Sequence, residues 1–310
     1  MKMGTARTLL AADIGGTRAR FRHAGGVLEL GTRDYPHIEA LLAAVFGRLY
    51  IGPGADVVLA VAGPAQGGRA RLTNLDWECD GAALRRRFGF NRLVLMNDLE
   101  AAAHTLAEQP PADAAVLHAG AAAGRQAVVS VSTGLGVAYW SRSGGMLHVE
   151  AAEAGHTGFA PGEAWEAEFL RALEAQHPGR VSWERVLSGA GLAALDAHLR
   201  QEPAASPAEV VQRARTGDEA AVAAVWRYSR LLGVFAGDLV LAAPAPGGVW
   251  LMGGVLAGLG ALFDTPAFLQ GFTAKGRLSP QLAQVPVRRT ADDHLGLTGA
   301  WLTAEALAPA

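Results

Sequence analysis

The stretch from Asn91 to His104 reads NRLVLMNDLEAAAH, and it decides how this chain folds. Arg92 to Met96 is apolar and rich in strand-forming residues, which predicts a buried β-strand. From Leu99 onward the alanine- and glutamate-rich sequence favours a helix. Asn97 and Asp98 therefore follow the carboxyl end of a strand, where open α/β sheets bind their ligands.

The Asn97–Asp98 pair has two interpretations. An aspartate at this place can accept a proton from a substrate hydroxyl, while the asparagine binds the other hydroxyls of the substrate. Aspartate and asparagine also commonly cap helices without binding any ligand. Taken alone, the pair favours the capping interpretation for Asp98; the rest of the chain favours catalysis.

Two further stretches combine an apolar strand with a glycine turn and a second strand. Thr8–Ala12 is apolar, ends at Asp13 and continues into GGTRARF, whose alternation predicts a strand rather than a helix. Ala127–Val131 continues into Ser132–Gly136 and then a second strand at Val137–Trp140. Glycine turns can bring bare backbone N–H groups up to phosphate oxygens, although Gly-Gly is also ordinary hairpin chemistry. The repetition predicts duplicated halves, as in folds that clamp ATP.

Three other segments contain candidate binding groups. The segment 149–161 shows no clear period and is expected to be a loop that presents Glu153 and His156. Glu184 falls in the first turn of a predicted helix, where acidic residues are favoured even without a ligand. Gly253 and Gly254 open a helix after a buried strand, which suits a nucleotide but also simple helix–strand packing.

Composition limits the possible classes of function. The chain has 310 residues and a formal net charge of −2, so it has no general attraction to nucleic acid or anionic membranes. The single cysteine, Cys79, excludes an internal disulfide and a cysteine-based zinc cluster. The N-terminal apolar run ends at Asp13 and is too short for a signal-peptide core, so we expect a cytoplasmic protein.

The domain organisation follows from breaks in the pattern. The sequence between Pro110 and Gly124 is rich in Pro, Ala and Gly, and we expect the first domain boundary there. Leu239–Phe263 has no charged residue and is long enough to span a bilayer, but PAPGG and a glycine pair interrupt it, which favours buried core. His294–Leu307 is expected to be a final helix that returns to the first domain.

Nine motifs in order make the chain resemble the bacterial glucokinases of the hexokinase and actin-like ATPase superfamily. They are ADIGGTRAR, VAGPA, LTNLDW, LMNDLEAAAH, STGLGVA, EAGHTGFAP, ERVLSGAGL, LMGGV and KGR. The related ROK sugar kinases have a zinc-binding cysteine motif after GHT, which this chain lacks. Some of those relatives are repressors with an added N-terminal DNA-binding domain, and Asp13 comes too early to leave room for one.

The resemblance implies a two-domain actin-like ATPase fold of the α/β class, ribonuclease H-like, with a sugar and ATP cleft between the domains. The expected small domain is 1–112 plus about 292–310, and the expected large domain is 113–291. The implied reaction is ATP-dependent phosphorylation of the 6-hydroxyl of glucose. The implied assembly is a homodimer, with no nucleic acid or membrane as partner.

The resemblance also implies roles for individual residues. Asp98 matches the catalytic base, and Asp13 matches the acid that positions Mg²⁺, through water because Mg²⁺ keeps much of its hydration shell. The sugar-binding residues would be Asn97, Asp98, Glu153, His156 and Glu184. The nucleotide-binding residues would be Asp13, Gly15, Gly16, Thr17, Thr133, Gly134, Gly136, Gly253 and Gly254.

Three residues depart from the family pattern. Arg18 stands where asparagine is usual, Ser132 replaces a glycine, and Leu99 replaces a phenylalanine. These departures leave every catalytic group in place, but they weaken the inference that glucose is the best substrate. Two alternatives therefore stay open: a kinase of the same fold for fructose, mannose or an amino sugar, or with polyphosphate as donor, and a catalytically silent sugar-binding regulator.

Overall fold

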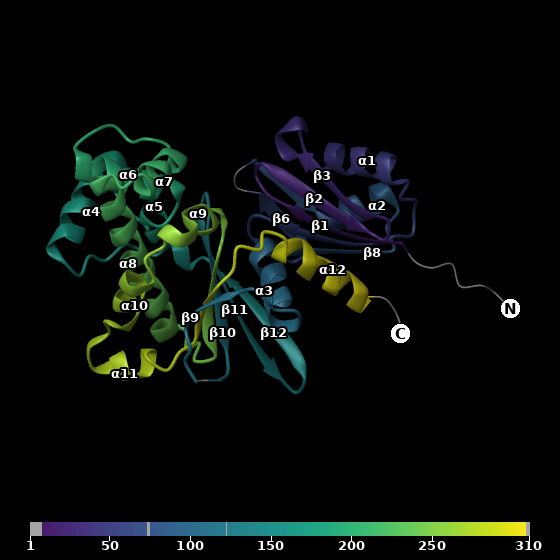
Figure 1. The fold of residues 1–310 in the computed structure, drawn as a ribbon. Helices are drawn as coiled ribbons and strands as arrows, with labels where there is room; N and C mark the ends of the chain where they lie inside the picture. The colour runs from purple at the N-terminus through teal and green to yellow at the C-terminus, as the bar shows by residue number, and fades with distance from the viewer. Residues whose placement is uncertain (1–7, 73–74, 122, 308–310) are drawn as a thin grey trace. The chain divides into compact units, whose positions relative to one another are not determined.

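A computed structural model describes residues 8–72, 75–121 and 123–307. Two residues of the LTNLDW motif, Thr73 and Asn74, lie outside the described residues. The chain divides into two compact units, which we call unit 1 (Met1–Pro110 and His294–Ala310) and unit 2 (Pro111–Asp293). Both units are mixed α/β structures (Figure 1).

Unit 1 is built on a five-stranded sheet with the order β3-β2-β1-β4-β8. Strands β1, β4 and β8 are parallel, and β2 and β3 extend the sheet as antiparallel strands. A small sheet of order β5-β6-β7 lies in the same unit. The strands are β1 (Leu9–Ile14), β2 (Arg18–His23), β3 (Gly26–Gly31), β4 (Asp56–Val61), β5 (Ala65–Gln66), β6 (Arg69–Leu72), β7 (Trp77–Asp80) and β8 (Arg92–Asn97). The helices are η1 (Thr32–Asp34), α1 (Ile38–Leu49), α2 (Gly81–Phe88), α3 (Asp98–Glu108) and α12 (Leu295–Leu307).

Alternating side chains of the unit 1 sheet enter two different cores, as the period of a strand requires. On β1, Leu10 and Ala12 pack in the cluster that contains Leu41 of α1. The intervening Ala11 packs in the cluster that contains Ala101 of α3 and Ala300 of α12. Helix α12 therefore covers the sheet of unit 1 together with α3, after the chain has passed through all of unit 2.

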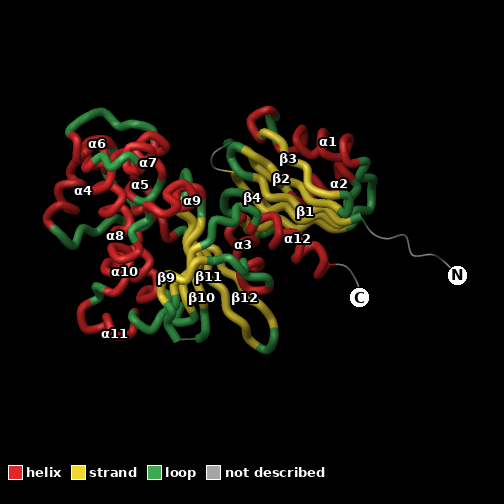
Figure 2. Tube along the Cα trace, in the orientation of Figure 1, coloured by secondary structure: helices red, strands yellow, loops and turns green. Residues whose placement is uncertain are grey.

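Unit 2 is built on a six-stranded sheet with the order β12-β11-β10-β13-β14-β9. Its strands are β9 (Ala115–His118), β10 (Gln126–Val131), β11 (Leu135–Ser143), β12 (Met146–Ala152), β13 (Gly248–Met252) and β14 (Val287–Arg289). The helices up to α8 are η2 (Ala154–His156), α4 (Ala164–Gln176), α5 (Trp183–Val186), α6 (Gly189–Arg200), α7 (Pro207–Arg215) and α8 (Glu219–Ala242). They are followed by α9 (Gly254–Leu259), η3 (Gly260–Leu262), α10 (Thr265–Thr273), η4 (Gly276–Leu278) and α11 (Ser279–Leu282). The tube in Figure 2 shows these helices in red and the strands in yellow.

The two sheets repeat one topology. Strand β1 pairs with β2 antiparallel and with β4 parallel, and β10 pairs with β11 antiparallel and with β13 parallel. Both predicted glycine turns therefore join antiparallel strands, as the alternation of their sequences indicated. The segment 239–263 forms the end of α8, strand β13, α9 and η3. Among the described residues no single helix is long and apolar enough to cross a membrane. The sharply bent helix pair Gly254–Leu262 and Thr265–Thr273, taken together, has the length and apolar composition of a membrane span.

Two details of the expected structure were wrong. The segment 149–161 is not wholly a loop, because Val149–Ala152 is the end of strand β12, which pairs with β11. The strand expected at 92–96 is β8, but it is mostly half-buried rather than buried, because it lies at the edge of its sheet. The sequence between Pro110 and Gly124 contains strand β9, which has no clear sequence period.

Candidate functional site

The start of α3 places Asp98 in the first turn of the helix and gives the capping role to Asn97. Asn97 Oδ1 accepts hydrogen bonds from the N–H groups of Leu99 (2.9 Å) and Glu100 (3.3 Å). The Glu100 carboxylate in turn accepts the Asn97 N–H at 3.3 Å, which completes a capping box. Asp98 also accepts the Leu99 N–H, at 3.0 Å. Asn97, rather than Asp98, is therefore the N-cap of α3.

Asn97 is anchored at a third point. Its Nδ2 donates to the carbonyl oxygen of Gly63 at 3.0 Å, at the turn that follows β4. A side chain at Gly63 would lie 2.0 Å from the Arg71 carbonyl oxygen, so only glycine fits there. The Asn97 amide has two N–H donors, and this bond uses one of them. Within the described ranges, this leaves one donor of Asn97 for a ligand.

Asp13 lies at the same edge of the unit 1 sheet as Asn97 and Asp98. Ile14 pairs with Val61, and Val61 pairs with Asn97, so the three parallel strands end in register. Strand β1 is separated from β8 by β4 alone, and neighbouring strands lie about 4.8 Å apart. The parallel strands thus bring two half-buried carboxylates to the carboxyl edge of one sheet, Asp13 on β1 and Asp98 directly after β8.

Gly296 of α12 packs against Asp13. A Cβ atom built on Gly296 would lie 3.0 Å from both Cγ and Oδ2 of Asp13. The absence of a side chain at Gly296 therefore leaves the space that the Asp13 carboxylate occupies. The sequence reasoning did not identify Gly296, because some 280 positions separate it from Asp13 and no local pattern marks it.

The first glycine turn joins β1 to β2 and contains Gly15, Gly16 and Thr17. The Gly15 N–H donates to the Arg18 carbonyl oxygen at 2.9 Å, which closes the turn. Thr32, which is fully buried, supports the turn from η1. Its hydroxyl donates to the Gly15 carbonyl oxygen at 2.9 Å, and its N–H donates to the Thr17 carbonyl oxygen at 3.0 Å. Thr32 is a second supporting residue that the sequence reasoning missed.

The second glycine turn joins β10 to β11 in unit 2. The Ser132 N–H donates to the Gly134 carbonyl oxygen at 2.9 Å, and the Ser132 carbonyl oxygen accepts the Gly189 N–H at 3.0 Å. The Leu135 N–H donates to Glu184 Oε2 at 3.0 Å. A side chain at Gly134 would lie 2.7 Å from the same carboxylate oxygen. Glu184, which lies 49 positions beyond Leu135 in the sequence, therefore fixes this turn.

Glu153, His156 and Glu184 form a cluster next to the second turn. His156 Nε2 lies 3.7 Å from Glu153 Oε2, and His156 Nδ1 lies 4.0 Å from Glu184 Oε1. The side chains of Glu153 and His156 are 68% and 59% exposed, while that of Glu184 is 29% exposed. The cluster offers two carboxylates and an imidazole, which together can donate to and accept from several hydroxyl groups.

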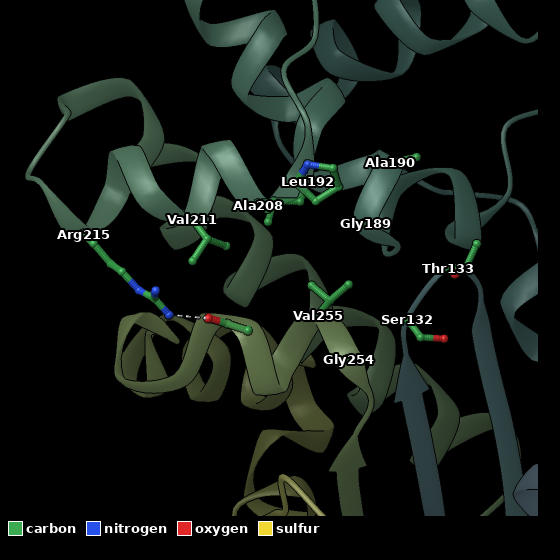
Figure 3. A pocket seen from close by; sticks show the side chains of 12 residues that line it. Ser132, Thr133, Gly189, Ala190, Leu192, Ala208, Val211, Arg215, Gly254 and Val255 are labelled. Atoms are coloured by element: carbon green, nitrogen blue, oxygen red, sulfur yellow. Dashed lines mark hydrogen bonds between the residues drawn. The ribbon is translucent and has the colours of Figure 1, made fainter. Parts of the chain in front are cut away.

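A cavity of about 580 Å³ opens beside the second turn, within unit 2 (Figure 3). Its lining is mostly apolar or glycine: Gly189, Ala190, Leu192, Pro207, Ala208, Val211, Gly254, Val255 and Gly258. The polar residues of the lining are Ser132, Thr133 and Arg215. Figure 3 shows Arg215 extended toward the end of α9, where its Nη2 donates to the Gly258 carbonyl oxygen at 3.0 Å. The size and lining suit a flat heterocyclic base.

Gly253 directly precedes Gly254, which lines this cavity. It has φ of 108°, and a Cβ atom there would lie 2.4 Å from the carbonyl oxygen of Val131. Glycine is therefore required where β13 passes into α9, because strand β10 approaches the backbone closely. Of the nucleotide residues expected in unit 2, Thr133 and Gly254 line the cavity. Helices α6 and α7 supply most of the rest: the α6 residues belong to the motif ERVLSGAGL, whereas the α7 residues belong to none of the nine motifs.

The three departures from the family pattern have different surroundings. Arg18 is 63% exposed, and its Nη1 lies 3.6 Å from Glu29 Oε1 on β3. Leu99 is buried and packs as a core residue. Ser132 is exposed and lines the cavity.

Cys79 is buried, and burial raises the pKa of its thiol to about 12, so the thiol is unreactive.

The predicted site residues fall into one set in each unit. Unit 1 brings together Asp13, Gly15, Gly16, Thr17, Asn97 and Asp98 at one sheet edge. Unit 2 contains Thr133, Gly134, Gly136, Glu153, His156, Glu184, Gly253 and Gly254. Within the described ranges, no group of three or more His, Cys, Asp or Glu side chains could form a metal site.

Comparison with known proteins decides the family. The glucokinase family model matches residues 10–307. The chain belongs to the glucokinase family. A glucokinase from Chromobacterium violaceum is 35% identical over 304 residues, which cover 94% of this chain and 87% of that protein. The glucokinase of Caulobacter vibrioides strain NA1000 is 33% identical over 312 residues, covering 94% and 93%.

Solved structures agree with this membership of the glucokinase family. The crystal structure of a glucokinase from an Antarctic psychrotroph superposes with a TM-score of 0.82 at 30% identity, covering 97% of this chain and all of that one. A ROK hexokinase from Thermus thermophilus superposes with a TM-score of 0.67 at 20% identity, covering 96% and 98%, and so shares the fold alone. The expected two-domain actin-like ATPase fold is confirmed.

Proposed function

We propose that this member of the glucokinase family transfers the γ-phosphoryl group of ATP to the 6-hydroxyl of glucose, with Asp98 as the general base. The observation that supports this most is the position of Asp98. It follows the carboxyl end of β8, it is half-buried, and Asn97 rather than Asp98 caps the helix. A carboxylate in the first turn of an 11-residue helix also benefits from the helix dipole.

In this proposal the remaining residues bind the sugar and the nucleotide and orient them for the reaction. One donor of Asn97, together with Glu153, His156 and Glu184, binds the other sugar hydroxyls. The apolar cavity binds adenine, and the two glycine turns bind the phosphates through backbone N–H groups. Asp13 would hold Mg²⁺ through water, which suits a single half-buried carboxylate, and Mg²⁺ would neutralise phosphate charge. Phosphoryl transfer depends mostly on such positioning and neutralisation.

The variant Asp98→Asn tests the base. General-base assistance contributes about 10²–10⁴-fold, so we expect turnover to fall by that factor while glucose still binds. Turnover is measured as glucose-dependent ADP production, and glucose binding by calorimetry. The same substitution at exposed Asp34 of unit 1 is the control and should leave turnover unchanged. Equal turnover in Asp98→Asn and the unaltered protein contradicts the assignment.

The same assay separates the alternatives. A silent sugar-binding regulator binds glucose without producing ADP. A panel of glucose, fructose, mannose and amino sugars, each with ATP or polyphosphate, identifies another acceptor or donor by its higher kcat/KM. The resemblance also suggests a homodimer, which sedimentation velocity measures directly.

A further inference from the structure

The β10–β11 turn lines the apolar cavity with one part and contacts Glu184 with another. Ser132 and Thr133 line the apolar cavity. The next two residues contact Glu184, since the Leu135 N–H donates to Glu184 Oε2 at 3.0 Å and Gly134 packs against the same oxygen. One short turn is therefore shared by the candidate nucleotide cavity and the Glu153–His156–Glu184 cluster.

Backbone groups also support the turn. Gly155 lies directly against it, because a Cβ atom there would be 2.0 Å from the Leu135 carbonyl oxygen. The Ser132 carbonyl oxygen accepts from Gly189. Among these supports, Glu184 is the only one that acts through a side chain. A side chain can change rotamer, so the Glu184 bond is the support that a ligand can strengthen or release.

The two carboxylate oxygens of Glu184 have different neighbours. Oε2 accepts the Leu135 N–H, and Oε1 lies on the side of His156, 4.0 Å from its Nδ1. The Glu184 side chain is 29% exposed, so part of the carboxylate can be reached from solvent. A hydroxyl that donates to Oε1 restricts rotation of the carboxylate and keeps Oε2 against the turn.

We propose that Glu184 is a positioning residue that couples the sugar site to the phosphate-binding turn. The inference rests on the proposed function, because it takes the cluster as the sugar site and the turn as a phosphate site. A bound sugar fixes Glu184, Glu184 fixes the turn, and nucleotide then binds to a preorganised backbone. By thermodynamic linkage the nucleotide must strengthen sugar binding by the same factor.

The coupling factor is the ratio of the Kd of a non-hydrolysable ATP analogue without glucose to its Kd at saturating glucose, measured by calorimetry with Mg²⁺ present. For the unaltered protein we expect a factor of about ten, within the usual range for coupled sites. Glu184→Ala should reduce the factor to about one even when enough glucose is added to saturate the variant. A purely structural role in sugar binding would raise the Kd for glucose and leave the factor unchanged.

Glu153→Ala is the matched control. Glu153 belongs to the same cluster, and its contact in that cluster is His156, at 3.7 Å. We expect weaker glucose binding in this variant with the coupling factor preserved. A factor that survives in Glu184→Ala, or that Glu153→Ala abolishes equally, overturns the inference.

Gly134→Ala tests the same link from the other direction. The added methyl group would lie 2.7 Å from Glu184 Oε2 and displace the carboxylate. We expect the Kd for glucose, measured without nucleotide, to rise several-fold. Gly158→Ala is the control, since no atom lies within 4 Å of a Cβ atom at that position. An unchanged Kd in Gly134→Ala contradicts the link, whatever the outcome for Glu184→Ala.

The results distinguish this inference from the proposed function. If the unaltered protein binds neither glucose nor the ATP analogue, the proposed function itself is wrong. If it binds both with a coupling factor of one and still phosphorylates glucose, the proposed function stands and the role of Glu184 is refuted.

Discussion

At the scale of single residues, the environment of Asp13 depends on an absent side chain. Gly296 is buried at the start of α12 and leaves room for the Asp13 carboxylate. A glycine in a helix costs stability relative to alanine, so its presence at this position calls for a local reason. The close approach to Asp13 supplies one.

Gly296→Ala should therefore disturb Asp13 without changing any polar group. Because small displacements of a positioning group are costly, we expect turnover to fall roughly 10- to 100-fold, with an increased requirement for Mg²⁺. Steady-state assays over a range of Mg²⁺ concentrations measure both effects. Gly47→Ala, where no atom lies within 4 Å of a Cβ atom, is the matched control in helix α1. A normal Mg²⁺ dependence in Gly296→Ala would show that Asp13 tolerates the methyl group.

Residues such as Gly296 and Thr32 also mark the limit of sequence reasoning. Asp13, Asn97 and Asp98 could be proposed because each follows an apolar strand and stands beside glycine or helix-forming residues. Thr32 and Gly296 act on sites 17 and about 280 positions away, and the sequence around them shows no motif. Only the fold brings such partners together.

At the scale of elements, the first glycine turn depends on a buried hydroxyl. Thr32→Val keeps the shape of the side chain but leaves the Gly15 carbonyl oxygen without the Thr32 hydroxyl. We expect a loss of about 1–2 kcal/mol in the free energy of unfolding and a higher KM for ATP. Chemical denaturation and steady-state kinetics measure these quantities. Thr32→Ser keeps the hydroxyl and should retain most of the ATP affinity; equal KM values in both variants would exclude the hydroxyl as a support.

Helix α3 contains a histidine whose titration should affect stability. Burial lowers the pKa of His104 from its ordinary value of 6.5, partly offset by Glu108. The unfolded chain therefore binds a proton at a pH where the folded chain does not. Stability should fall as the pH drops below about 6.5, until the folded pKa is reached.

His104→Gln removes this contribution, so its free energy of unfolding should decline less between about pH 7.5 and pH 5.5 than that of the unaltered protein. Urea denaturation at several pH values measures the difference. The same substitution at exposed His148 is the control. Identical pH profiles for His104→Gln and the unaltered protein would contradict the assignment.

The elements that could be predicted are those with a strong apolar period. Strands β1, β10 and β13 are mostly buried, β8 is mostly half-buried, and all four were expected near their actual bounds. Strand β12 was missed in part, because its residues are exposed or half-buried and it lies at the edge of its sheet. Edge strand β8, by contrast, was expected because its sequence is apolar.

At the scale of the whole molecule, the two units have separate hydrophobic cores. One cluster of described residues belongs to unit 2, and the two others belong to unit 1. The smaller cluster of unit 1 includes Ala300 and Ala304 of α12. A defect in α12 should therefore affect unit 1 first, although the helix follows unit 2 in the sequence.

Ala300→Asp tests this separation. A charge buried without a partner costs about 3–5 kcal/mol, so β1, β4 and β8 should lose protection from hydrogen exchange while β10 and β13 keep theirs. Mass spectrometry of exchanged peptides measures protection in each strand. Ala306→Asp places the same charge at an exposed position of the same helix and should change neither unit. Equal loss of protection in both units of Ala300→Asp would show that they unfold together.

The return of α12 to unit 1 also has a consequence for synthesis on the ribosome. The sheet that bears Asp13 and Asp98 is translated early, but one of the two helices in its second core is among the last segments to emerge. Until then Ala11, Val58 and Ala60 lack that helix, and the nascent polypeptide presents an apolar surface that chaperones can recognise. Premature termination within unit 2 should therefore yield fragments prone to aggregation and proteolysis rather than a free-standing first half.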